Sequence, residues 1–153
     1  DRHVQAARAA RDLVLPLLVR HSGVELHERA CRLLEPESIC EASILLDRCW
    51  DGHWVADSGE TLLLRLQGAR AAAVLCLAER LRPGRLRVAE LALEVQVAPP
   101  TDEVHQIVTS AALETLTTSL AAARAPVRLA LTLDAALGSR RLAMLFARAL
   151  RGS

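Results

Sequence analysis

The sequence predicts an α+β (or α/β) fold in which a helical N-terminal part packs on a mixed sheet of about four strands. Three observations lead to this prediction. Apolar residues recur at helical spacing through residues 1–50, short alternating runs follow, and a β-α-β-α order closes the chain. With 153 residues, a single domain over 1–153 is expected, with a helical part at 1–50 and an α/β part at 60–151.

The first third of the chain has the pattern of three helices. Residues 2–20 carry apolar side chains at helical spacing, but Pro16 is expected to kink or split this helix because proline lacks a backbone N–H. Residues 24–34 and 37–50 repeat the helical spacing. Residues 51–59 hold two glycines and two aspartates, which are typical of a loop.

The middle of the chain is expected to contain strands. Thr61–Leu66 is a short apolar run that ends at a glycine turn. Residues 69–81 are ambiguous: their alanines favour a helix, and their position between two strands favours a strand, which is preferred. Residues 86–97 alternate apolar and polar side chains, and a slip of phase at Ala89-Glu90 predicts a β-bulge.

The C-terminal half is predicted to be β-α-β-α. After the strand at 86–97, Thr101 is expected to cap a helix over 101–123 that carries one apolar stripe. A cleanly alternating strand at 127–133 and a final helix at 139–150 follow. If the two strands lie parallel in one sheet, the crossover between them should be right-handed.

Arginine supplies every basic side chain. The chain has no lysine, asparagine or tyrosine, which are residues with AT-rich codons, so a GC-rich gene explains the arginine-rich composition. Its arginines are therefore no sign of phosphate or nucleic-acid binding. With 19 arginines against 18 acids, a formal net charge of +1 and no basic block, nucleic acid is an unlikely partner.

Two features bear on the compartment. No uncharged apolar stretch reaches the roughly 18 residues of a membrane span, so none is expected. The four cysteines form no C-x-x-C pair, so reduced thiols in a cytoplasmic, intracellular protein are expected.

Histidines and cysteines raise one metal hypothesis. His27 and Cys31 are four residues apart on a predicted helix, and Cys49 and His53 are four apart at the end of the next. Together they would offer two thiolates and two imidazoles, a donor set that suits zinc. Because this spacing is not diagnostic, the preferred interpretation is core thiols and surface histidines, with no metal and no cofactor.

No catalytic signature is present. Cys40, Ser43, Ser58 and Ser110 could each supply a nucleophile, but none lies in a nucleophile-elbow pattern. The seven glycines are too scattered to form a phosphate-binding loop. The chain is therefore expected not to be an enzyme.

Asp102, Glu103 and His105 gather where the helix over 101–123 is expected to begin. They could serve as an acid–base group. Acidic residues in a first helical turn also complement the helix dipole, which accounts for both carboxylates. The preferred interpretation is that these residues stabilise the start of the helix.

The element order from Thr61 to Leu150 resembles that of the GNAT-type N-acetyltransferase family. The matching segments are 86–97, 101–123, 127–133 and 139–150. That family's cofactor motif is R/Q-x-x-G-x-G/A, whereas residues 99–104 contain no glycine and place two carboxylates where a pyrophosphate would lie. The resemblance implies at most a degenerate acetyltransferase-like domain. The mixture of helices and a compact sheet is also similar to small secretion-type chaperones.

A non-enzymatic protein–protein interaction or assembly domain is the favoured function. Abundant apolar helical surface in residues 1–50 would explain docking onto a protein partner or self-association into an oligomer. Tryptophan is enriched at binding hot spots. The candidate interface residues are Trp50, Trp54, Leu13 and Leu17. The alternatives are the degenerate acetyltransferase-like domain and the chaperone.

Overall fold

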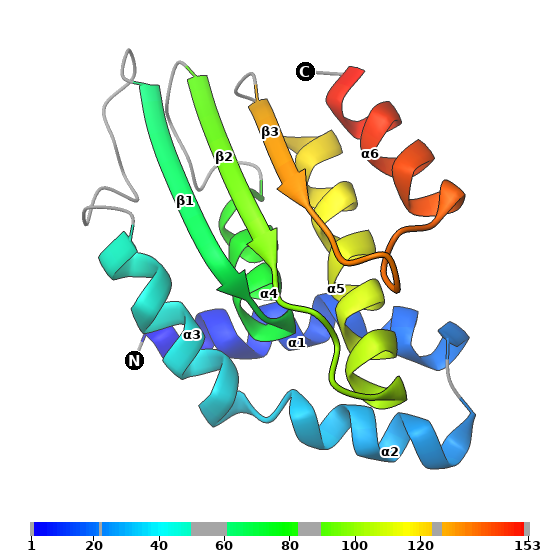
Figure 1. The fold of residues 1–153 in the computed structure, drawn as a ribbon. Coiled ribbons are helices and arrows are strands. Elements are labelled where there is room, and N and C mark those ends of the chain that lie inside the picture. Colours follow the sequence, from blue (N-terminus) through cyan, green and yellow to red (C-terminus); the bar gives the residue numbers. More distant parts are fainter. Residues whose placement is uncertain (1, 22, 50–60, 83–89, 124–126, 152–153) are drawn as a thin grey trace.

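The computed structural model describes residues 2–21, 23–49, 61–82, 90–123 and 127–151 (Figure 1). Its elements are α1 (Arg2–His21), α2 (Val24–Leu33), α3 (Pro36–Cys49), β1 (Thr61–Ala69), α4 (Ala71–Arg80), β2 (Glu90–Val97), α5 (Glu103–Ala122), β3 (Val127–Thr132) and α6 (Arg140–Arg151). The expected α+β fold, with a helical N-terminal part and a β-α-β-α C-terminal half, is confirmed. The described residues form three strands in place of about four.

The strands form one parallel sheet in the order β1-β2-β3, so the described sheet is not mixed. Leu64 of β1 is in register with Leu93 of β2, which is in register with Leu129 of β3. Helix α4 connects β1 to β2, and α5 connects β2 to β3. Figure 1 shows the crossover through α5 to be right-handed, as expected.

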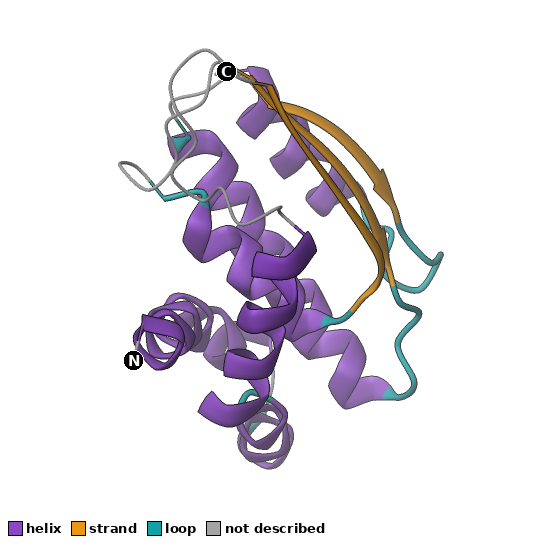
Figure 2. Ribbon diagram, turned by 90° about the vertical axis from the view of Figure 1, so that its left-hand side faces the viewer, coloured by secondary structure: helices purple, strands orange, loops and turns teal. Residues whose placement is uncertain are grey.

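All the helices lie on one side of the sheet, and no described element covers the other face (Figure 2). Along β2, Leu91, Leu93, Val95 and Val97 are buried, while the residues between them are more exposed. Parallel sheets usually have both faces covered and carry continuous apolar runs. Because one face is open here, β2 alternates between buried apolar and more exposed side chains, whereas β1 also places Leu63, which is 50% exposed, on the open face.

The open face of the sheet carries cross-strand ion pairs. Arg65 Nε of β1 lies 2.7 Å from Glu94 Oε2 of β2, and Arg128 Nε of β3 pairs with Glu90 Oε1 of β2. Opposite charges on neighbouring strands stabilise a sheet modestly. These pairs give the open face a polar and balanced character.

Helix α5 lies at the centre of the molecule, between the sheet and helices α1 and α2 (Figure 2). All of residues 111–117 are buried, because neighbours cover this helix on both sides. Its buried hydroxyls donate back to the helix backbone: Thr115 Oγ1 to Ala111 O at 2.9 Å and Thr117 Oγ1 to Glu114 O at 2.6 Å. The expected helix at 101–123 is confirmed.

Helix α1 runs through Pro16 without ending, so the expectation that proline splits it is wrong. Proline deprives the carbonyl four residues earlier of its N–H donor. Pro16 and Asp12 are both exposed, so water can bond that carbonyl. The helix packs on α3, α4 and α5.

Residues 71–80 form helix α4, so the strand preferred for 69–81 is wrong. Alanine has the highest helix propensity, and this segment begins with three. Adjacent parallel strands also require a long crossover between them, so a position between β1 and β2 calls for a helix. Residues Val74–Arg80 are buried because α4 packs on α1, α3 and α5.

Strand β1 contains a register irregularity. The pairing of β1 with β2 shifts between Leu66 and Ala69, where Gly68 adopts a φ of 65°, a left-handed conformation that favours glycine. The β-bulge predicted at Ala89-Glu90 falls partly on Ala89, which lies outside the described residues.

Candidate functional site

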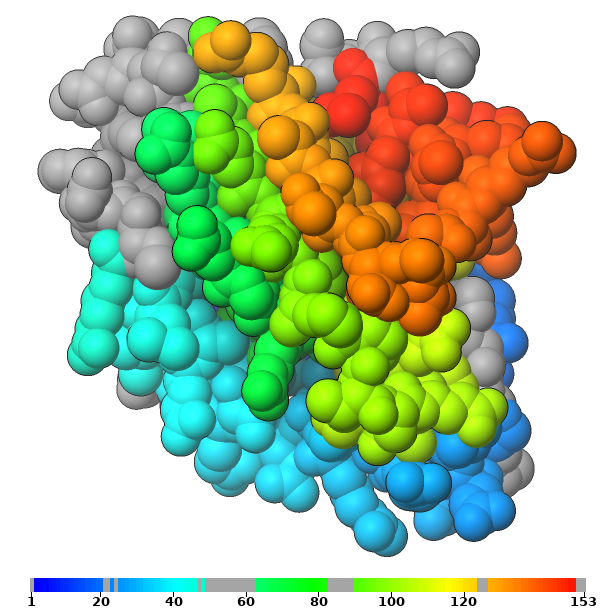
Figure 3. Space-filling model, viewed as in Figure 1, coloured from blue at the N-terminus to red at the C-terminus, as the bar shows by residue number. Residues whose placement is uncertain are grey.

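An apolar groove of about 340 Å³ lies between β3 and α6, and we call it the β3–α6 groove. Figure 1 shows α6 running back beside β3, and Figure 3 shows the two elements side by side at the surface. Three leucines at and beyond β3 form one wall, and one face of α6 forms the other. The lining residues are Leu129, Leu131, Leu133, Gly138, Ser139, Leu142, Ala143, Phe146 and Leu150.

The groove exists because α6 packs chiefly on α5. The α6 residues Leu142, Phe146 and Ala149 are 5%, 8% and 3% exposed, so most of the apolar side of α6 is buried. Leu129 and Leu131 of β3 point toward the helix side of the sheet, yet they remain only half-buried. Their apolar side chains lack the cover that the corresponding residues of β2 have.

The connection between β3 and α6 contributes Gly138 and Ser139 to the lining of the groove. Asp134 Oδ2 accepts the N–H of Ala136 at 3.0 Å, and Asp134 O accepts the N–H of Leu137 at 3.0 Å. Gln106 of α5 donates through Nε2 to Ala136 O at 2.9 Å, and Leu137 is 3% exposed. The turn is therefore anchored to α5.

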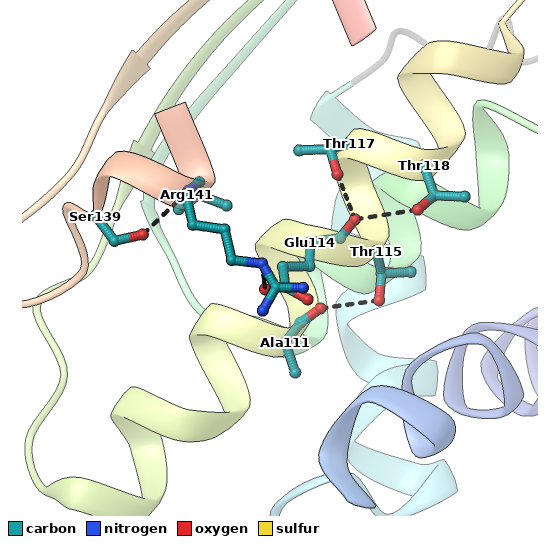
Figure 4. A network of polar contacts seen from close by, with 8 residues as sticks. Ala111, Glu114, Thr115, Thr117, Thr118, Ser139 and Arg141 are labelled. Atoms are coloured by element: carbon teal, nitrogen blue, oxygen red, sulfur yellow. Dashed lines mark hydrogen bonds and ion pairs between the residues drawn. The ribbon is translucent and has the colours of Figure 1, made fainter. Parts of the chain in front are cut away.

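Two polar contacts orient the start of α6 (Figure 4). Ser139 Oγ accepts the N–H of Leu142 at 3.1 Å, as a helix N-cap does. Arg141 Nε lies 3.6 Å from Glu114 Oε1 of α5, and the Glu114 side chain is 10% exposed. These contacts hold α6 in place, so the groove is preformed, as binding sites usually are.

The β3–α6 groove lies beside an open strand edge. β3 is the last strand of the sheet, and among the residues that the structure describes no segment pairs with its outer edge. Such an edge presents backbone N–H and C=O groups that can pair with another chain. The apolar groove and the open edge therefore form one continuous surface.

The segment around the groove is basic, although the chain as a whole is nearly neutral. Residues 127–151 contain five arginines and one acid, Asp134, whereas 14 arginines and 17 acids precede them. Arg140 and Arg148 of α6 are exposed, and no acid among the described residues forms an ion pair with either. Arg128 has Glu90 as its partner.

The structure brings together one half of the hypothetical metal set. Cys31 Sγ and His27 Nε2 are 3.5 Å apart on α2. The side chain of Cys49 and all of His53 lie outside the described residues. Within the described part of the chain, no three His, Cys, Asp or Glu side chains are grouped to hold a metal ion.

Asp102 caps α5, in place of the predicted Thr101. Asp102 Oδ1 accepts the N–H of His105 at 2.9 Å and lies 2.7 Å from His105 Nδ1. The backbone hydrogen bond from His105, followed by its side-chain bond, lowers the pKa of Asp102 below its ordinary value.

The same cluster lacks the geometry of a catalytic triad. Thr101 Oγ1 lies 3.0 Å from His105 Nδ1, the nitrogen that also contacts Asp102. A triad requires the hydroxyl and the carboxylate on opposite nitrogens of the imidazole. The cluster therefore serves the helix terminus, as the sequence analysis preferred.

The remaining candidate residues are dispersed. Trp50 and Trp54 lie outside the described residues. Leu13 and Leu17 of α1 are half-buried, and Leu17 packs against the core. Of the possible nucleophiles, Ser43 is fully buried and its Oγ accepts a hydrogen bond from Arg80.

The sequence pattern predicts both walls of the β3–α6 groove but not the groove itself. One signal was available: the last helix combines an apolar stripe with four arginines and no acid. Whether α6 covers or flanks β3 depends on its packing against α5, which no local pattern reveals.

Comparison with known proteins gives no family. No family model matches the chain, and no curated protein or solved structure matches it. Across the described residues, no helix combines the length and apolar character that crossing a membrane requires.

Proposed function

We propose that the protein is a non-enzymatic interaction module whose β3–α6 groove binds a segment of a partner protein. The observation that carries this proposal is the groove itself: a preformed apolar surface that continues into an open strand edge. Exposed apolar surface of this kind commonly marks a site of protein association. Strand edges flanked by apolar pockets are also a recurrent means of peptide recognition.

The chemistry of the lining supports a protein ligand over a small molecule. Ser139 is the one polar side chain among the lining residues, and its Oγ already accepts the N–H of Leu142. Small-molecule sites combine an apolar pocket with convergent polar groups that orient the ligand. Acid–base catalysis likewise needs a titratable group near the reacting atoms. The groove lining offers neither.

A peptide selection tests the proposal. A random peptide library displayed on phage is selected on the native protein, and the enriched peptides are then measured against groove variants. Ala143 lines the groove, whereas Met144 is 50% exposed and lies outside the lining on the adjoining side of the same helix, so Ala143→Trp and Met144→Trp are a matched pair. Filling the groove with an indole should weaken binding at least about tenfold, whereas Met144→Trp should leave it unchanged.

The selection can also reject the proposal. A selection that enriches no binder, or binders that ignore Ala143→Trp, would contradict a groove site. Because a bulky side chain can disturb packing, Leu131→Gln is the second groove variant, and circular dichroism confirms that each variant is folded. Leu131 is only half-buried, so this change alters the wall with little loss of core.

A further inference from the structure

We infer that the segment bound in the β3–α6 groove is an extended strand that carries acidic residues and adds to the outer edge of β3. This inference rests on the proposed function and specifies its ligand. Two observations support it: the open backbone edge of β3, and Arg140, an exposed arginine at one end of the groove with which no described acid forms an ion pair.

The open edge of β3 favours a strand over a helix as the bound segment. The outer edge of β3 has no partner among the described residues, and only an extended segment can pair with a row of backbone N–H and C=O groups.

The two walls have matching lengths. β3 has 6 residues and α6 has 12, which correspond to about 20 Å of strand and about 18 Å of helix. An added strand of about six residues would span the groove. Alternate side chains would enter the apolar groove, and those between them would lie on the open sheet face, beside Arg128, Ala130 and Thr132.

Exposed arginines lie at both ends of the groove, and the one on β3, Arg128, is already paired with Glu90. Arg128 is at the start of β3, and Arg140 is at the start of α6, which runs back along β3 (Figure 1). Arg140 precedes the lining residue Ala143 by three positions, so the two residues lie on the same side of α6. No described acid pairs with Arg140. An acidic residue near the end of an incoming segment that lies beside the start of α6 would therefore find an unpaired cation at Arg140.

The same charges disfavour a second copy of this chain as the occupant. Two copies joined at the β3 edges by a twofold axis would place residues 127–151 of both copies together. Each of these segments carries five arginines and one acid, and no described acid pairs with Arg140 or Arg148, whereas Arg128 and Arg141 pair with Glu90 and Glu114. Like charges across an interface cost free energy, so the groove fits a partner of different chemistry.

A defined peptide tests the ligand chemistry. The probe is an acetylated seven-residue peptide with valines at its second, fourth and sixth positions, threonines between them and a glutamate at each end. Its affinity for the native protein, measured by calorimetry at low salt, should fall about tenfold when arginines replace the glutamates. Methylation of alternate backbone nitrogens on the pairing side should abolish binding, because the methyl groups remove the donors.

Protein variants provide the controls. Arg140→Glu should weaken binding of the glutamate peptide about tenfold and strengthen binding of the arginine peptide. Arg148 is five positions from Ala143, on the other side of α6, so Arg148→Glu should change neither affinity by more than about twofold. Sedimentation equilibrium measures whether the protein is a monomer or a dimer. A dimer that dissociates in the Arg128→Glu variant would place a second copy of the chain at the β3 edge, and this would overturn the inference.

The outcomes separate the inference from the proposed function. If both end-charge peptides bind equally well, or if the N-methylated peptide binds as tightly as its parent, the inference is wrong. If the inference is wrong but Ala143→Trp still blocks peptide binding, the groove remains a binding site for a partner of another kind. If no peptide of either charge binds and the phage selection also enriches none, the proposed function fails as well.

Discussion

Arg141 of α6 lies 3.6 Å from Glu114 of α5, measured from Nε to Oε1, and this contact joins the last helix to the central one. The Arg141 side chain is 64% exposed, whereas that of Glu114 is 10% exposed. The carboxylate thus lies inside the molecule and its cation reaches it from the surface. This pair helps to set the position of α6 and therefore the width of the β3–α6 groove.

Removing the cation should destabilise the protein measurably. We expect Arg141→Ala to lower the free energy of unfolding by about 1–2 kcal/mol, between the values typical of exposed and of fully buried ion pairs. Urea unfolding provides the measurement. Arg148→Ala on the exposed side of the same helix is the control and should change stability by less than about 0.5 kcal/mol. Equal effects of the two changes would show that the pair contributes nothing.

Truncation in the central helix should have a larger effect. Leu116 of α5 is 0% exposed, and Leu116→Ala would leave a cavity in the core. We expect a loss of about 2–5 kcal/mol in the free energy of unfolding. Met144 of α6 is 50% exposed, so Met144→Ala should cost far less. A small effect of Leu116→Ala would contradict the central position of α5.

The contact between α3 and α4 predicts a specific polar effect. Arg80 Nη2 of α4 donates to Ser43 O at 3.0 Å and to Ser43 Oγ at 2.7 Å, and both residues are buried. Ser43→Ala removes one acceptor from a buried guanidinium and should cost about 1–3 kcal/mol. Ser110→Ala, at a half-buried serine of α5, is the matched control in the same unfolding experiment. If the two substitutions cost the same, the Arg80–Ser43 bond is not a stabilising contact.

The cap of α5 predicts how stability depends on acid. The pKa of Asp102 is lowered in the folded protein, so the carboxylate contributes stability that is present above the unfolded pKa of about 3.9. That contribution is lost as the pH falls through the lower, folded pKa. Asparagine caps helices well and does not titrate. The stability difference between the native protein and Asp102→Asn should therefore shrink as the pH falls from 6 to below the folded pKa.

Stability measurements across this pH range would check the prediction, together with an NMR titration of the Asp102 carboxyl. A titration midpoint at or above the ordinary value would contradict the cap geometry. A stability difference between the native protein and Asp102→Asn that stays constant with pH would also contradict the cap geometry. His105→Ala keeps the backbone N–H that bonds Asp102 Oδ1, so part of the lowered pKa should remain in that variant.

Periodicity predicted the elements of this fold wherever one face of an element is buried. β2 alternates because the other face of the sheet is open, and α6 shows a clear stripe because one side faces solvent. Periodicity does not identify α4, because residues 74–80 are all buried and the helix has no exposed side on which polar residues would recur. For such a segment the alanine content and the need for a crossover between parallel strands are better guides.

The candidate site could not be predicted in the same way. The leucines of β3 and the apolar side chains of α6 each have the pattern of ordinary core residues. The groove arises because α6 packs on α5, through the buried residues of α6 and the Arg141–Glu114 pair, and leaves β3 partly uncovered. The position of α6 is set by tertiary contacts between residues more than twenty positions apart in sequence, such as Arg141 and Glu114.

The most direct test of the central claim is a methyl NMR titration of leucine-labelled protein with the glutamate-ended peptide. We predict that methyl resonances of Leu129, Leu131, Leu133 and Leu150 shift on binding, whereas those of the fully buried Leu113 and of the exposed Leu45 on α3 stay unchanged. Shifts confined to α3 or α1, or no shift at all at saturating peptide, would contradict the assignment of the β3–α6 groove as the binding site.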